Sequence, residues 1–243
     1  MSDIVVYAFM PAWGLPSSGP FALKLIGWMN WQGIGHEVRV ENRSSKGPMG
    51  KSPWIETGGR RIADSDRIIR HLSVTRGLPD PTAPQDAVSA RALAVKTAAE
   101  ERLHQILEWE LFCHPAGRAG MLDLIRTDLP GPVARIVLHM MHRHFDRQLK
   151  ARGIGRMPPD EIRAEGLRQI EGLGHMLAEA PFLSGDRPAL ADFAVWGQVA
   201  PLLAWPMETP LAQEIKARPA IADWAARVAA QGQDGRTGLR GAT

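Results

Sequence analysis

Two polar residues, Asp64 and Ser65, stand directly before a run with helical spacing, where a helix is expected to begin. The first turn of a helix has unpaired amide groups and a partial positive charge, so a hydroxyl placed there can help to bind a carboxylate. Serine and aspartate are also the residues that most often cap helices. The chemistry alone therefore favours an ordinary N-cap over an anion site.

A proline, Pro53, occupies the first position of an expected strand. Only bonds that precede proline adopt the cis form at low cost, and a proline at a strand start removes a ladder donor that the sheet does not need. The residues by themselves leave two interpretations, a cis bond after Ser52 or an ordinary trans proline.

Three histidines, His139, His142 and His144, share one expected helix, and the spacing of the first two would place both on one face. No carboxylate or third ligand stands at a fitting spacing, so we expect a partly exposed polar face and no metal. The one cysteine, Cys113, lies near the end of another long helix, where a buried apolar thiol is the default. A lone cysteine also excludes the small secreted proteins that depend on intrachain disulfides.

The 243 residues carry 29 Lys and Arg against 26 Asp and Glu, a formal charge of +3. This slight excess does not indicate nucleic-acid binding. The N-terminus lacks a basic region followed by a long apolar stretch, and no segment has about 18 uninterrupted apolar residues. We therefore expect a cytoplasmic protein with no nucleic-acid or membrane partner.

Residues 4–75 alternate short apolar runs with helical patches in the order βαβ followed by ββα. A helix joins the first two strands, which predicts a parallel pair, whereas Gly58-Gly59 is typical of a tight antiparallel hairpin. Together these features predict a mixed sheet of about four strands with helices packed on it. The expected strands are residues 4–9, 36–40, 53–56 and 60–63, and the expected helices are residues 21–31 and a segment that begins near residue 64.

The pattern from Gln85 onward is helical throughout, and a proline-rich stretch separates it from the first half. The expected helices are residues 87–112, 133–150, 159–180, 189–203 and 221–230. We expect four parts: an α/β domain over residues 1–78, a linker over 79–85, an all-helical domain over 86–231 and a flexible tail over 232–243.

This organisation resembles the glutathione S-transferase superfamily, in which a thioredoxin-like domain precedes an all-α domain. Residues 50–55 (Gly-Lys-Ser-Pro-Trp-Ile) resemble the cis-proline loop of that family, and residues 62–69 resemble its acidic-Ser helix start. Residues 182–192 resemble the loop and cap of its second domain. Residues 20–25 and 151–156 look closest to the metaxin and failed-axon-connections branch.

The resemblance implies that glutathione is bound as a co-substrate. It implies a cis Ser52-Pro53 bond, which would turn the backbone groups of Ser52 outward to pair with the cysteinyl unit of glutathione. It also implies that Asp64 and Ser65, at the helix start, hold the γ-glutamyl end.

The sequence leaves three alternatives for the group that would activate the thiol. The family needs a hydroxyl or thiol near the start of the first helix, which donates a hydrogen bond to the glutathione sulfur and favours the thiolate. Aligning Pro20-Phe21-Ala22 with the family places Gly19 at that position. If the loop before the helix is one residue longer than is usual in the family, Ser18 would supply the hydroxyl, and Ser17 behind it would be a binding residue. Alternatively, Tyr7 resembles the activating tyrosine of other branches. A chain with no activating group is the third alternative.

Two further expectations follow from the resemblance. Asp192 resembles a buried capping carboxylate, but Ala189 stands where the Ser or Thr of a capping box is usual, so we expect Asp192 to bond the local backbone alone. Most tryptophans are expected in the core, whereas Trp13 and Trp109 are candidates to line an apolar pocket for a second substrate.

The leading expectation is thus a homodimeric glutathione S-transferase-like enzyme that transfers glutathione to a small apolar electrophile. The alternative is a non-catalytic scaffold of the same fold that binds a protein partner or an apolar ligand. Gly19 at the activating position motivates this alternative.

Overall fold

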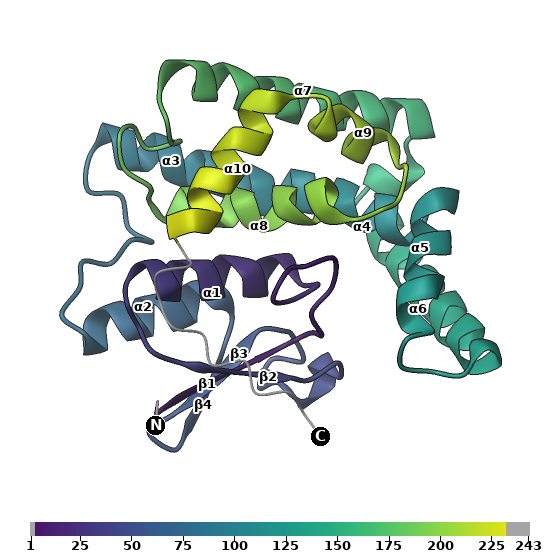
Figure 1. Ribbon diagram of the computed structural model, residues 1–243, viewed down its shortest axis with the longest axis horizontal. Coiled ribbons are helices and arrows are strands. Elements are labelled where there is room, and N and C mark those ends of the chain that lie inside the picture. Colours follow the sequence, from purple (N-terminus) through teal and green to yellow (C-terminus); the bar gives the residue numbers. More distant parts are fainter. Residues whose placement is uncertain (1–2, 232–243) are drawn as a thin grey trace.

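A computed structural model describes residues 3–231 of the chain (Figure 1). Residues 232–243, expected to form a flexible tail, lie outside the described residues. The first half forms a four-stranded sheet in the order β2-β1-β3-β4, with β1 and β2 parallel and the other pairs antiparallel, which confirms the expected mixed sheet. The strands are β1 (Ile4–Ala8), β2 (Glu37–Val40), β3 (Trp54–Thr57) and β4 (Arg60–Ala63).

Two helices of the first half, α1 (Pro20–Trp31) and α2 (Ser65–Thr75), complete the βαβ-ββα order. In β1, Ile4, Val6 and Ala8 are buried, while the alternate residues are partly exposed on the other face of the sheet. Figure 1 shows α1 between the sheet and the helices of the second half. Because α1 is covered on both sides, it is apolar almost all round.

The helices and turns of the second half include no β-strand within the described residues, as expected. The long helix expected over residues 87–112 contains a π-helical turn, and two helices that the pattern did not predict, α5 and α9, are present. No helix within residues 3–231 has both the length and the apolar character needed to cross a membrane. The remaining elements are η1 (Ser44–Lys46), α3 (Ala87–Ala98), η2 (Ala99–Leu103), α4 (His104–Phe112), α5 (Pro115–Ile125), α6 (Gly131–Ala151), η3 (Ile154–Arg156), α7 (Pro159–Glu179), α8 (Leu190–Ala204), α9 (Pro210–Lys216) and α10 (Pro219–Gln231).

The buried carboxylate of Asp192 ties three segments of the helical half together. It accepts hydrogen bonds from the backbone amides of Leu183 at 2.8 Å and Ala189 at 3.0 Å. The indole Nε1 of Trp224 donates a third hydrogen bond to it at 3.1 Å. The expectation that Asp192 bonds the local backbone alone is therefore wrong. Ala189 has no side-chain acceptor for the Asp192 amide, which donates instead to the carbonyl oxygen of Ala189 at 3.0 Å.

The two halves meet along α1 and α8, which cross at very short range. A Cβ atom added at Gly197 of α8 would lie 2.4 Å from the carbonyl oxygen of Pro20, the first residue of α1. At Gly27 of α1, an added Cβ would lie 3.1 Å from a ring carbon of Phe193. The absence of a side chain at Gly197 therefore allows the start of α1 to lie directly against the helical half.

We expect Gly197→Ala to lower the free energy of unfolding by about 1–3 kcal/mol, because its methyl group collides with backbone that cannot rotate away. The greater helix propensity of alanine, about 1 kcal/mol, offsets only part of this cost. Urea unfolding measures the change. Gly27→Ala is the matched control: its neighbour is a side chain that can shift, so its effect should be smaller. A Gly197→Ala protein as stable as the parent would contradict the close contact.

Candidate functional site

The register of the sheet brings four chain segments to one end of it. Tyr7 of β1 and Ala63 of β4 both pair with Trp54 of β3, and Ala8 pairs with Val40 of β2. The segments that follow β1, β2 and β4 and the segment that precedes β3 therefore meet at this end. The helices α1 and α2 both begin there, so two positive helix ends face the same region.

The start of α1 is built around Gly19, its N-cap, which is buried. The amide of Gly19 donates to the Oγ of the fully buried Ser17 at 3.1 Å. The amide of Ser18 donates to the carbonyl of Met10 at 2.8 Å, while its hydroxyl has no hydrogen-bond partner among the described residues and is half-buried. A Cβ at Gly19 would lie 3.0 Å from the ring of Phe9, so this position has little room for an activating side chain.

The loop before β3 carries the cis Ser52-Pro53 bond that the resemblance implied. Pro53 is buried and Ser52 is partly buried. Within the part of the chain that the structure describes, the Oγ of Ser52 is buried without a hydrogen-bond partner. A buried hydroxyl without a partner is uncommon in folded proteins and calls for an explanation such as a bound molecule.

At the start of α2, Asp64 is the N-cap and accepts a hydrogen bond from the amide of Arg67 at 3.0 Å. The amides of Ser65 and Asp66 have no partner within the helix. Ser65 is buried, and its hydroxyl makes no hydrogen bond to any described residue. Asp64 has a φ angle of +74°, a strained conformation for a residue other than glycine that often marks a ligand site.

Tyr7 lies apart from these groups, on the outer face of the sheet. Its ring stacks on Trp54 at a centroid distance of 3.7 Å, and its hydroxyl donates to Glu56 Oε2 at 2.9 Å. Burial and the hydrogen bond to Glu56 raise the pKa of the Tyr7 hydroxyl. This donor is therefore already engaged, whereas that of Ser18 is free among the described residues.

Ion pairs among four charged side chains connect the first turn of α2 to α1 and to the helical half. Lys24 and Lys96 each contact both Asp66 and Glu100, with N–O distances between 2.5 and 2.8 Å. Burial disfavours the charged form of Asp66, but the two lysines outweigh it and keep the pKa of Asp66 below its usual value. Sequence reasoning missed this cluster; a lysine within the apolar residues of α1 was the available signal.

Aromatic rings of the first half contact the helical half at two places. The Phe21 ring meets His104 edge-on at 4.8 Å, and His104 Nδ1 lies 3.0 Å from Gln198 Oε1. Trp13 meets Trp205 edge-on at 5.8 Å, and Trp109 lies beside His114 at 5.7 Å. Trp13 and Trp109 are both partly buried and packed against the core.

The other sequence candidates lie at the end of α4 and in α6. Burial raises the pKa of Cys113 to about 11, so its thiol stays protonated at neutral pH. His142 Nδ1 lies 2.7 Å from the carbonyl of Phe112, and His144 meets the ring of Phe145. Across residues 3–231, no group of three or more His, Cys, Asp or Glu side chains could hold a metal ion.

Family comparisons match both halves of the chain. A model of the glutathione S-transferase N-terminal domain matches residues 20–117, and a model of the glutathione S-transferase C-terminal domain matches residues 167–228.

Known proteins show the same likeness over most of the chain. An isoprene-epoxide glutathione S-transferase from Rhodococcus sp. (strain AD45) is 25% identical over 94% of this chain and 98% of its own length. Failed axon connections from Drosophila melanogaster is 29% identical over 81% of this chain, which spans only 50% of that protein. The fold is also that of the theta class glutathione S-transferase from Xanthomonas axonopodis pv. citri with glutathione bound, with a TM-score of 0.53 and 15% identity over 96% of this chain and 97% of that one.

We expect Asp66→Asn to lower the free energy of unfolding by about 2 kcal/mol at pH 7, because it leaves two buried lysines with one carboxylate. The folded pKa of Asp66 lies below its ordinary 3.8. The stabilisation that the charge of Asp66 provides is therefore complete above pH 3.8. It is lost as the pH falls through the lower pKa that Asp66 has in the folded protein. Urea unfolding of parent and variant from pH 7 to pH 3 measures the difference, which should shrink in acid.

The exposed pair Asp146–Lys150 supplies the control for this measurement. Asp146→Asn should change stability little at any pH, because exposed pairs contribute little. An Asp66→Asn effect that is equal at pH 7 and pH 3 would show that the charge of Asp66 is not the cause.

Proposed function

Since the chain belongs to the glutathione S-transferase superfamily, we propose that it binds glutathione at this end of the sheet and transfers it to a small apolar electrophile. One observation carries the proposal. Two helix N-termini and the unpaired hydroxyls of Ser18, Ser52 and Ser65 belong to the segments that meet there. Glutathione carries two carboxylates and a thiol, and such groups stabilise a carboxylate and a thiolate as anions.

The γ-glutamyl carboxylate is assigned to the start of α2. The amides of Ser65 and Asp66 and the hydroxyl of Ser65 are the donors available there. Asp64 caps the helix and fixes its first turn. The cysteinyl unit is assigned to the backbone of Ser52 beside Pro53, which places the thiol toward the start of α1.

Ser18 is the proposed activating residue. Its hydroxyl is half-buried and free to donate to the glutathione sulfur, whereas the Tyr7 hydroxyl already donates to Glu56. Ser17 supports this arrangement by accepting the amide of Gly19, which fixes the loop before α1. A donor near the sulfur favours the thiolate, which is the reactive form.

An epoxide is the electrophile class that we propose to test first, because one relative acts on an isoprene epoxide by its name. The thiolate sulfur forms a bond to an epoxide carbon, the carbon–oxygen bond breaks, and the oxygen takes a proton from water. The partly buried rings of Trp13 and Trp109 are the proposed lining for an apolar second substrate. A cytoplasmic homodimer is also part of the proposal; sedimentation would test the dimer and fractionation of cells the location.

A scaffold without transferase activity is the second candidate. Gly19 favours it, because the position aligned with the activating residue has no side chain and little space for one. A stoichiometric protein partner, recovered with a chain that turns over no electrophile, would support it. Turnover of an epoxide by the purified protein would exclude it.

The proposal predicts that Ser18→Ala lowers kcat/KM for styrene oxide about 10- to 100-fold, because a hydrogen bond to a charged sulfur contributes about 1.5–3 kcal/mol. Conjugate formation with glutathione in excess measures this change. Tyr7→Phe is the matched hydroxyl deletion and should stay within about twofold of the parent, because its hydroxyl serves Glu56.

Calorimetry on the same proteins separates binding from activation. Ser65→Ala should weaken glutathione binding, whereas Ser18→Ala should bind glutathione nearly as the parent does at low pH, where the thiol is protonated. No heat of binding at millimolar glutathione for the parent protein would exclude the proposed function.

A further inference from the structure

A cavity lies at the end of α1 opposite to the proposed glutathione site. It has a volume of about 370 Å³, within the range of roughly 300–1,000 Å³ that is usual for small-molecule sites. Its walls come from the last turn of α1, the stretch that links the two halves, the first turns of α3 and the loop before α8. Since a helix rises about 1.5 Å per residue, the cavity and Ser18 are roughly 15 Å apart along α1.

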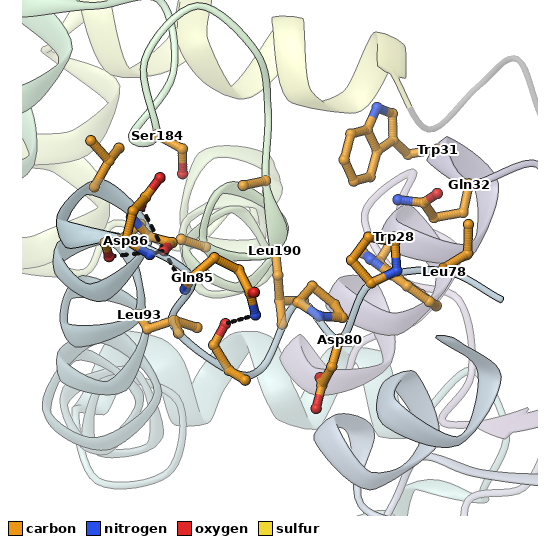
Figure 2. Close-up of a pocket in the computed structure, with 18 residues that line it drawn as sticks. Trp28, Trp31, Gln32, Leu78, Asp80, Gln85, Asp86, Leu93, Ser184 and Leu190 are labelled. Carbon is orange, nitrogen blue, oxygen red and sulfur yellow. Dashed lines mark hydrogen bonds between the residues drawn. The ribbon is translucent and has the colours of Figure 1, made fainter. Parts of the chain in front are cut away.

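Aromatic and polar side chains gather at the end of the cavity where α1 finishes. Figure 2 shows Trp28, Trp31 and Gln32 together on one side of the view. Asp80, from the stretch that links the two halves, lies below them. Trp31, Gln32 and Asp80 are all partly exposed, so each can contact a molecule in the cavity.

The charges of the lining favour a cation. Among the lining residues, Asp80 and Asp86 are acidic and none is basic. Arg70, outside the lining, approaches Asp80 to 3.5 Å, but its side chain is 54% exposed, so water screens its charge. The face of an indole ring also attracts a positive charge, which adds to the effect of the carboxylates.

The helix ends around the cavity favour a cation at the same place. The last turn of α1 carries a partial negative charge, and no basic residue lies in it. The positive starts of α3 and α8 also border the cavity, but a carboxylate is bonded at each of them. Asp86 accepts the amide of Ser89 in α3, and Asp192 accepts the amide of Ala189 before α8. The negative end of α1 is therefore the helix end without a compensating charge.

The rest of the lining is mainly apolar. It includes Val88, Ala92 and Leu93 of α3 and Leu190 of α8. Figure 2 shows Leu93 across the cavity from the tryptophans. A hydrocarbon group placed there is removed from water, which favours binding. The cavity thus suits a molecule that is positively charged at one end and apolar at the other.

We propose that this cavity binds a primary amine with an aromatic or aliphatic group, in its ammonium form. The ammonium group lies at the end of α1, against the Trp31 ring, and donates hydrogen bonds to Asp80 and Gln32. The apolar group lies against Leu93 and Leu190. The site is separate from the transferase site and does not depend on glutathione.

The test compares two probes of almost equal shape, 2-phenylethylamine and 2-phenylethanol, of which only the amine is positively charged at neutral pH. Calorimetry with the full chain measures both affinities. We expect the amine to bind about tenfold more tightly, because its charge meets a carboxylate and an indole face. A cavity without preference for a cation would bind the alcohol more tightly, because the alcohol costs less to remove from water. Saturating glutathione should leave the affinity for the amine unchanged.

A variant at Asp80 tests the source of this preference. Asp80→Asn removes the negative charge but keeps a side-chain oxygen that can accept from the amide of Thr82. It should weaken binding of the amine about five- to tenfold and change binding of the alcohol less than twofold. Asp123→Asn is the matched control, because Asp123 is exposed on α5 and does not line the cavity. It should change neither affinity.

A variant that fills the cavity from the linking stretch tests the location. Ala83 lines the cavity, so Ala83→Phe should weaken binding of the amine about tenfold or more, because its ring occupies the same space. Ala87 lies on α3 nearby, is exposed and does not line the cavity, so Ala87→Phe is the matched control.

Four results would overturn the proposal. The first is an amine that does not bind, or binds no more tightly than the alcohol. The second is an equal effect of Asp80→Asn and Asp123→Asn on the amine, and the third is an equal effect of Ala83→Phe and Ala87→Phe. The fourth is displacement of the amine by glutathione, which would place the probe in the transferase site instead.

Discussion

The contact between α1 and α8 fixes the start of α1, the place proposed for activation of the thiol. Gly197 allows the carbonyl of Pro20 to lie against α8, so the start of α1 is fixed by backbone atoms. Ser18 is two residues away from Pro20, and its amide is anchored by Met10. A shift of the helical half would therefore move the proposed activating hydroxyl directly.

The charges around the site follow from the same packing. Lys24, buried in α1, pairs with Asp66 and Glu100, and Lys96 completes the set. Two lysines and two carboxylates cancel, so the cluster fixes α2 without adding net charge. The positive ends of α1 and α2 then remain available for an anionic ligand, which agrees with the proposed binding of glutathione through a carboxylate and its thiolate.

Local sequence signals predicted the sheet and part of the site. The Gly58-Gly59 hairpin, the helix start at Asp64 and the strand opened by Pro53 depend on backbone preferences that a few residues determine. The interactions of Tyr7 and Lys24 could not be predicted, because Glu56 and Glu100 reach them only through the tertiary fold.

Helix α5 was missed for a related reason. Its glycines weaken the helical pattern, but they are required by packing: a Cβ at Gly117 would collide with the backbone of Glu110, and one at Gly120 with Met207.

The pKa of the glutathione thiol bound to this protein tests the central claim most directly. Ultraviolet absorbance of the thiolate, followed against pH with saturating glutathione, measures it in the parent and in Ser18→Ala. If Ser18 donates to the sulfur, the bound thiol in the parent titrates about one to two pH units below free thiol, and Ser18→Ala returns it toward the free value. An equal thiol pKa in the two proteins would contradict the role of Ser18.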